Sequence, residues 1–147
     1  MAQRVAIGCD HAGYGLKRYL CELLAEQGYD VVDVGVQSRD SVDYADYAHR
    51  VAALVAADEV WRGLLVCGSG IGMCMTANRY RGVRAACCHD VTSVRYARLH
   101  NNANVLTLGE RLVSYNVAGI CLDIFLTTEF EGGRHQRRIE GIEDKSS

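Results

Sequence analysis

The chain has 147 residues, of which 49% are hydrophobic and 23% are charged, a composition typical of one globular domain. Its formal net charge of −2 excludes the broad positive surface of a nucleic-acid-binding protein. No apolar run approaches about 18 residues, and the first residues lack a hydrophobic signal segment. We therefore expect no nucleic-acid or membrane partner and a cytoplasmic location.

Strand-like and helix-like patterns alternate along the chain. The predicted strands cover residues 4–9, 29–34, 63–67, 83–88 and 104–108. The predicted helices cover about 16–27, 45–57, 73–79, 92–99, 114–126 and 134–142. This order predicts one domain over 1–147 of the α/β class, a three-layer α/β/α sandwich around a five-stranded parallel sheet, Rossmann-like or flavodoxin-like in outline. Ligands of such sheets bind beyond the carboxyl ends of the strands.

The seven cysteines include no C-x-x-C pair, and several lie in predicted strands or helices. This pattern favours free thiols over a zinc ribbon or a dithiol redox motif. No metal site is predicted.

Polar side chains follow the first predicted strand, where Asp10 and His11 place a carboxylate and an imidazole. These two residues are candidates for a ligand site at this edge of the sheet. The alternative is that His11 only makes hydrogen bonds within its loop.

A glycine-rich loop, Cys67 to Gly72 with the sequence CGSGIG, follows the third predicted strand and leads into a helix. Glycines in this position let backbone N–H groups converge on an anion, and the thiolate of Cys67 would lie beside them. The alternative is that Cys67 is a small hydrophobic residue that ends a strand.

A dinucleotide-binding site is an alternative interpretation of the same loop. In that interpretation Asp33, at the end of the second predicted strand, would be the acid that binds the ribose. The spacing is G-x-G-x-G rather than G-x-G-x-x-G, and it follows the third strand rather than the first. A Rossmann-like nucleotide module is therefore a weaker alternative.

Four basic residues and one asparagine near the last predicted strand and the last predicted helix are further candidates. His100 and Asn101 end a helix, Arg111 follows a strand, and Arg134 and Arg138 are four residues apart on one helical face. The arginines could clamp a phosphate. A helix-terminal histidine and a solvated charged face are the ordinary alternatives.

Six strings in chain order together resemble ribose-5-phosphate isomerase type B. They are GCDHAGYGLK (8–17), VDYADYA (42–48), CGSGIGM (67–73), ANRYRGVRAA (77–86), ARLHNNANVLTLGER (97–111) and EGGRHQRR (131–138). The wider family includes allose-6-phosphate isomerases and subunits of galactose-6-phosphate isomerase. The resemblance implies aldose–ketose isomerisation through an enediolate, with ribose 5-phosphate and ribulose 5-phosphate as the expected pair.

The resemblance also implies roles for individual residues. Cys67 would be the base as a thiolate, Ser69 a proton relay, and His100 the acid and base of ring opening. Asp10 would hold sugar hydroxyls or assist ring opening. The residues implied for binding are the glycine-loop members Gly68, Gly70, Ile71 and Gly72, the positioning residues Tyr44 and Asn101, and the phosphate-binding residues His11, Arg111, Arg134 and Arg138. No metal or organic cofactor is implied.

The family resemblance further implies a homodimer in which the last helix, about 134–142, completes the partner's site. Pairing of dimers into tetramers is left open. A six-carbon sugar phosphate is the alternative substrate, and a non-catalytic sugar-phosphate-binding subunit is the alternative function. Many relatives have proline where this chain has Ala45, which leaves the placement of Tyr44 open.

Overall fold

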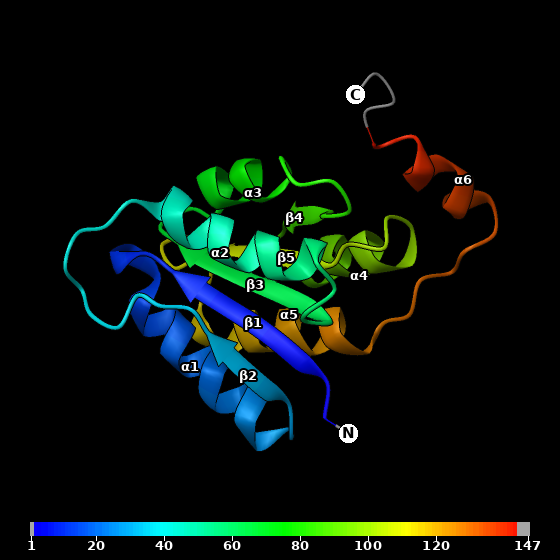
Figure 1. Cartoon of the computed structure of the whole chain (residues 1–147). Helices are drawn as coiled ribbons and strands as arrows, with labels where there is room; N and C mark the ends of the chain where they lie inside the picture. Colours follow the sequence, from blue (N-terminus) through cyan, green and yellow to red (C-terminus); the bar gives the residue numbers. More distant parts are fainter. Residues whose placement is uncertain (1, 144–147) are drawn as a thin grey trace.

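The computed structural model describes residues 2–143, which contain five strands, six α-helices and one 3₁₀ helix (Figure 1). The strands are β1 (Arg4–Cys9), β2 (Asp30–Asp33), β3 (Arg62–Cys67), β4 (Ala85–Cys87) and β5 (Val105–Gly109). The helices are η1 (His11–Gly13), α1 (Tyr14–Glu26), α2 (Tyr44–Ala56), α3 (Ile71–Ala77), α4 (Val91–Leu99), α5 (Tyr115–Thr127) and α6 (Arg134–Glu140). None of the helices in this range is long and apolar enough to cross a membrane.

All pairings in the sheet are parallel, in the order β2-β1-β3-β5-β4, which confirms the predicted fold class. Relative to the flavodoxin order 2-1-3-4-5, the last two strands are exchanged. As a result β5, rather than β4, lies beside β3, and Cys67 pairs with Gly109. The loop after β5 therefore adjoins the glycine loop after β3.

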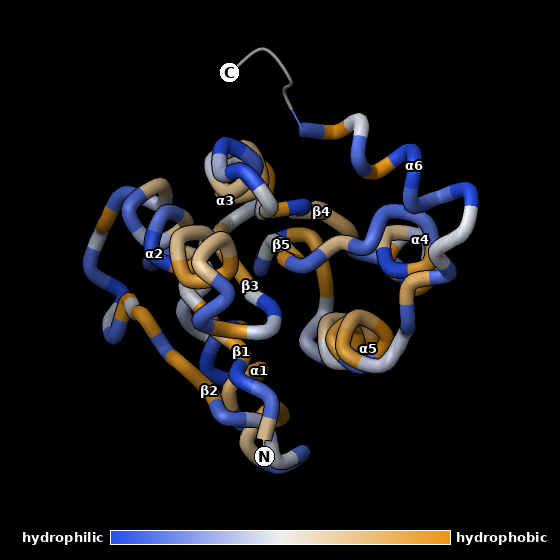
Figure 2. The backbone as a smooth tube through the Cα atoms, turned by 45° about the vertical axis from the view of Figure 1, so that its right-hand side comes forward, coloured by the Kyte–Doolittle hydropathy of each residue, from blue (hydrophilic) through white to orange (hydrophobic). Residues whose placement is uncertain are grey.

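Two hydrophobic cores cover the two faces of the sheet. Alternate residues of β1, β3 and β5 pack against α1, α4 and α5, and the intervening residues pack against α2 and α3. Figure 2 shows these layers, with α2 and α3 on one side and α5 on the other, and shows that α5 is largely hydrophobic. α6 lies away from the sheet at the end of an extended segment (Figure 1).

Several element boundaries differ from the prediction for local reasons. α3 begins at Ile71, two residues earlier than predicted, because Gly70 adopts a left-handed conformation (φ 78°) that ends the loop. β4 covers only Ala85–Cys87 because it is an edge strand with β5 as its single neighbour. η1 was not predicted, and the side chain of Asp10 caps it.

Candidate active site

A pocket of about 570 Å³ opens at the carboxyl edge of the sheet, where β1 and β3 lie side by side. The strand order reverses at this point, which is where open α/β sheets bind ligands. Its lining residues are Asp10, His11, Ala12, Tyr44, Cys67, Gly68, Ser69, Ile71, Gly72, Met75, Arg111 and Leu112. The pocket thus brings together most of the residues predicted for the site.

The loop after β1 holds Asp10 and His11 in defined orientations. One carboxylate oxygen of the buried Asp10 accepts hydrogen bonds from the amides of Ala12 and Gly13, at 3.0 and 3.1 Å. Nδ1 of His11 accepts the amide N–H of Val42 at 3.2 Å. In the neutral imidazole the hydrogen must therefore be on Nε2, which leaves that atom as a donor for an anion.

The glycine loop directs polar backbone groups at Cys67 and Ser69. The amide of Gly70 donates to Sγ of Cys67 at 3.1 Å, and the amide of Ile71 donates to Oγ of Ser69 at 3.3 Å. The amide of Gly72 has no acceptor within residues 2–143. The amide of Gly70 thus orients the sulfur of Cys67, and the free amide of Gly72 remains available to a ligand oxygen.

Arg111 lies over Gly68 because β5 is paired with β3. The amide of Arg111 donates to the carbonyl of Gly68 at 3.1 Å, and a Cβ on Gly68 would lie 3.0 Å from a guanidinium nitrogen. This places a positive charge in the lining of the pocket that also contains His11.

His89 holds the end of β5 from which Arg111 extends, and the sequence analysis did not predict this role. Its Nε2 accepts the amide N–H of Gly109 at 2.8 Å. A Cβ on Gly109 would lie 2.5 Å from Cα of Ser69, so the turn before Arg111 packs directly on the glycine loop. Burial lowers the pKa of His89, which favours the neutral form that can accept this bond.

Tyr44 lies in the pocket although Ala45 replaces the proline that many relatives have. Its ring packs on Gly72, where a Cβ would lie only 2.4 Å from a ring carbon. The side chain remains 45% exposed, so the phenol is accessible at the pocket mouth.

The remaining predicted residues do not line this pocket. His100 caps the C-terminus of α4, which runs back to the amino edge of the sheet, where β5 begins. Six residues of β3 separate the two edges by about 17 Å. Arg134 and Arg138 are exposed on α6, whose buried side chains are His135 and Ile139.

Asn101 lies at a different cavity, which is larger at about 650 Å³. That cavity is lined by residues of the segment between α3 and β4, of β4, of α4 and the segment after it, and of the C-terminal segment that includes Glu143. Of the residues predicted for the site, Asn101 alone is among its lining residues.

Asp33 does not behave as a ribose-binding acid. One of its carboxylate oxygens pairs with Nζ of Lys17 at 2.8 Å, and the other accepts the amide of Gly35 at 2.9 Å. Lys17 is almost fully buried, so this pair is part of the fold. The structure therefore adds nothing to the nucleotide-binding alternative.

Comparison with known proteins connects this site to one family. Residues 5–142 match the family model described as Ribose/Galactose Isomerase. The chain is 42% identical over 140 residues to ribose-5-phosphate isomerase B of Escherichia coli, covering 95% of this chain and 94% of that protein. It is 39% identical over 141 residues to ribose-5-P isomerase B of Listeria innocua, covering 96% and 95%.

Solved structures agree with the sequence relatives. A ribose 5-phosphate isomerase from Thermotoga maritima superposes with a TM-score of 0.94 at 46% identity, covering 97% of this chain and 98% of that chain. The type B ribose 5-phosphate isomerase of Trypanosoma brucei gives a TM-score of 0.93 at 43% identity, with 97% of each chain covered. A match over nearly the whole chain, with the pocket at the expected edge, shows that this protein belongs to the ribose/galactose isomerase family.

Proposed function

We propose that this chain is an aldose–ketose isomerase that interconverts ribose 5-phosphate and ribulose 5-phosphate. The observation that supports this most strongly is the hydrogen bond from the amide of Gly70 to the sulfur of Cys67, in a pocket that is also lined by the positively charged Arg111. A volume of about 570 Å³ is in the range of small-molecule sites. The relatives named as ribose-5-phosphate isomerases support the choice of sugar.

In the proposed mechanism Cys67 moves the proton between C2 and C1 of the open-chain sugar. A thiol is acidic enough for modest stabilisation of its thiolate to yield a base near neutral pH. The free amide of Gly72 would bind the developing enediolate oxygen, and Ser69 would relay a proton between the two oxygens. Since the amides of Gly70 and Ile71 already bond Cys67 and Ser69, their first role is to orient these side chains.

The phosphate would bind at the positive groups of the pocket. Nε2 of His11 and the guanidinium of Arg111 belong to residues that line the same pocket, and both are donors that suit phosphate oxygens. Asp10 and Tyr44 would bind sugar hydroxyls, since both line the same pocket.

The site is completed, in this proposal, by a second copy of the chain. His100, Asn101, Arg134 and Arg138 lie outside the Cys67 pocket of their own chain, and the two arginines are exposed. A two-fold dimer that joins the amino edge of one chain to the carboxyl edge of the other would form two equivalent composite sites. His100 of one chain would then open the sugar ring at the Cys67 of its partner.

An assay of the purified protein on ribose 5-phosphate, allose 6-phosphate and galactose 6-phosphate tests this function. We expect the highest kcat/KM with ribose 5-phosphate. Turnover of any of the three sugar phosphates should require Cys67. The Cys67→Ser variant should bind phosphate but lose at least about a thousandfold in kcat, because a hydroxyl is a far weaker acid than a thiol. Phosphate binding without turnover by the wild type would instead identify a non-catalytic binding subunit.

A further inference from the structure

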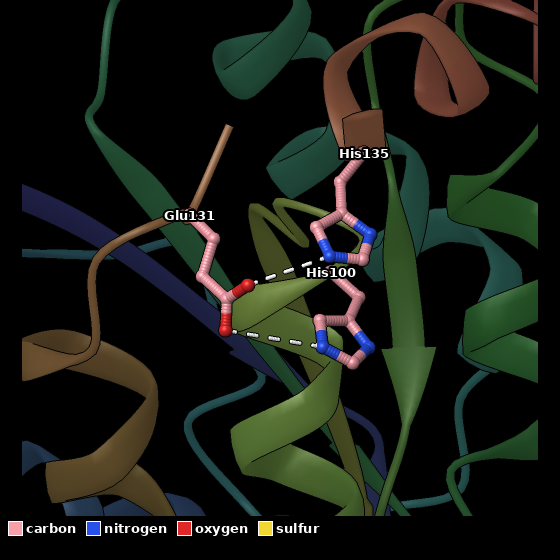
Figure 3. A group of neighbouring side chains, drawn as sticks. All are labelled: His100, Glu131 and His135. Atoms are coloured by element: carbon pink, nitrogen blue, oxygen red, sulfur yellow. Dashed lines mark ion pairs between the residues drawn. The ribbon is translucent and has the colours of Figure 1, made fainter. Parts of the chain in front are cut away.

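Three side chains at the amino edge converge on one point outside the Cys67 pocket. Figure 3 shows Nε2 of His100 and Nε2 of His135 both facing the carboxylate of Glu131. The distances are 3.9 Å from His100 to one carboxylate oxygen and 3.4 Å from His135 to the other. One ligand atom from each residue can be chosen so that all three lie within 4.8 Å of one another.

These spacings differ from those of a hydrogen-bonded cluster. None of the three pairs forms a hydrogen bond within residues 2–143, where such bonds to a carboxylate would measure about 2.7–2.9 Å. Ligand atoms around a tetrahedral Zn²⁺ lie about 3.4 Å apart, given metal–ligand bonds near 2.1 Å. The distance of 3.4 Å between His135 and Glu131 matches this spacing, and the half-exposed side chain of Glu131 is able to shorten the distance of 3.9 Å to His100.

The backbone holds the three residues in place. The amide of Glu131 donates to the carbonyl of Leu99 at 3.1 Å, which ties the extended segment before α6 to the end of α4. His135, in the first turn of α6, is buried and stacks on the ring of His100 with 4.2 Å between the ring centroids. The nearly parallel rings present both Nε2 atoms to the carboxylate of Glu131. Rotation of the partly exposed His100 side chain would turn its lone pair toward an ion held by His135 and Glu131.

We propose that His100, Glu131 and His135 bind a late first-row divalent cation such as Zn²⁺, and that this ion inhibits the enzyme. Two imidazoles and one carboxylate are a common zinc ligand set and leave a position for water. A neutral imidazole that binds metal through Nε2 carries hydrogen on Nδ1, so it has no lone pair left for acid–base chemistry. The inhibition rests on the proposed ring-opening role of His100, whereas the binding site does not.

Cobalt binding tests the site independently of activity. Co²⁺ added to the metal-free protein should give visible d–d absorption at one equivalent per chain, without the near-ultraviolet band of a cobalt–thiolate. His135→Gln and Glu131→Gln should each abolish this absorption, and His49→Gln, a control histidine that contacts Tyr80, should retain it. Absence of the bands, a thiolate band, or bands that persist in both ligand variants would overturn the site. Circular dichroism checks that each variant is folded.

Kinetics test the inhibition. Zn²⁺ should slow the conversion of ribose 5-phosphate at least about tenfold more than the reverse reaction, since ribulose 5-phosphate has no five-membered ring to open. In the His135→Gln variant, the difference between the inhibition of the two directions should be smaller than in the wild type. The rates of each protein are measured with and without Zn²⁺. Equal inhibition in both directions would overturn the inhibitory role and point to Cys67 as the metal's target. Absence of isomerase activity in the metal-free protein would refute the proposed function, while the cobalt spectra would still decide the metal site.

Discussion

The backbone amide of Gly70 donates a hydrogen bond to the sulfur of Cys67, with 3.1 Å between nitrogen and Sγ. This contact depends on the left-handed backbone of Gly70 and on its close approach to β5, where a Cβ would lie 2.9 Å from the carbonyl carbon of Leu108. Only glycine satisfies both conditions without strain.

Gly70→Ala should therefore lower the free energy of unfolding by about 1–3 kcal/mol and displace the amide that donates to the sulfur of Cys67. We expect a lower kcat as well, measured together with urea unfolding. Gly28→Ala is the matched control, because Gly28 also has positive φ but has nothing within 4 Å of an added Cβ. If both variants lost the same stability and activity, the close approach at Gly70 would have no functional meaning.

The cysteines should differ widely in reactivity. Burial raises the pKa of Cys9 to about 12 and that of Cys21 to about 11, and it also raises the pKa of Cys74, Cys88 and Cys121. Because the thiolate is the reactive form, iodoacetamide at pH 7 should modify these five slowly.

Cys67 should be modified before those five, with activity lost in step and with protection by a phosphorylated competitor. Peptide mass spectrometry at timed intervals measures this order. Loss of activity while Cys67 remains unmodified would argue against its role as the base.

Protonation of His89 should weaken the fold at low pH. Burial lowers the pKa of His89 in the folded state, although Asp90 opposes this shift, so the unfolded chain binds its proton first as pH falls below about 6.5. The contribution of His89 to stability is therefore complete above that pH and is lost as pH falls through the lowered folded value.

The His89→Gln variant checks this pH dependence, since glutamine can accept the amide of Gly109 but does not titrate. Urea unfolding between pH 5 and about 7.5 should show a smaller loss of stability in the variant than in the wild type. An identical pH dependence in the two proteins would contradict the assigned hydrogen bond.

Sequence patterns were sufficient for the fold class and for predicting that several of the candidate residues end at the same edge of the sheet. Asp10, His11, Cys67 and Arg111 meet because parallel strands end at one edge, a rule that needs only the strand positions. The exchange of β4 and β5 was not predictable from alternation of elements, because strands and helices alternate along the chain in the same way for both strand orders. It decides that Arg111, rather than His89, lies beside Gly68.

The contacts of His89, Glu131 and His135 were not predicted because they depend on the tertiary structure. Each residue has an ordinary place in its own segment, and only the fold brings His135 onto the ring of His100. The spacing of Glu131 and His135 gave no local signal, because α6 begins only at Arg134 and Glu131 lies in the segment before it.

The proposed ring-opening role of His100 predicts an asymmetric loss of activity. His100→Asn should lose most turnover of cyclic ribose 5-phosphate and retain a measurable rate from ribulose 5-phosphate, which needs no ring opening. A coupled assay in each direction gives the two rates. Equal losses would reassign His100 to proton transfer or to substrate positioning.

The central claim, that each site combines the two edges of different chains, is tested most directly by mixing two inactive variants. Cys67→Ala and Arg138→Ala chains are denatured, combined in equal amounts and refolded, after each alone is shown to have negligible turnover. Random pairing makes about half of the dimers mixed, and each mixed dimer has one intact composite site. We predict recovery of about a quarter of wild-type activity, whereas verified mixed dimers that remain inactive would contradict the shared site.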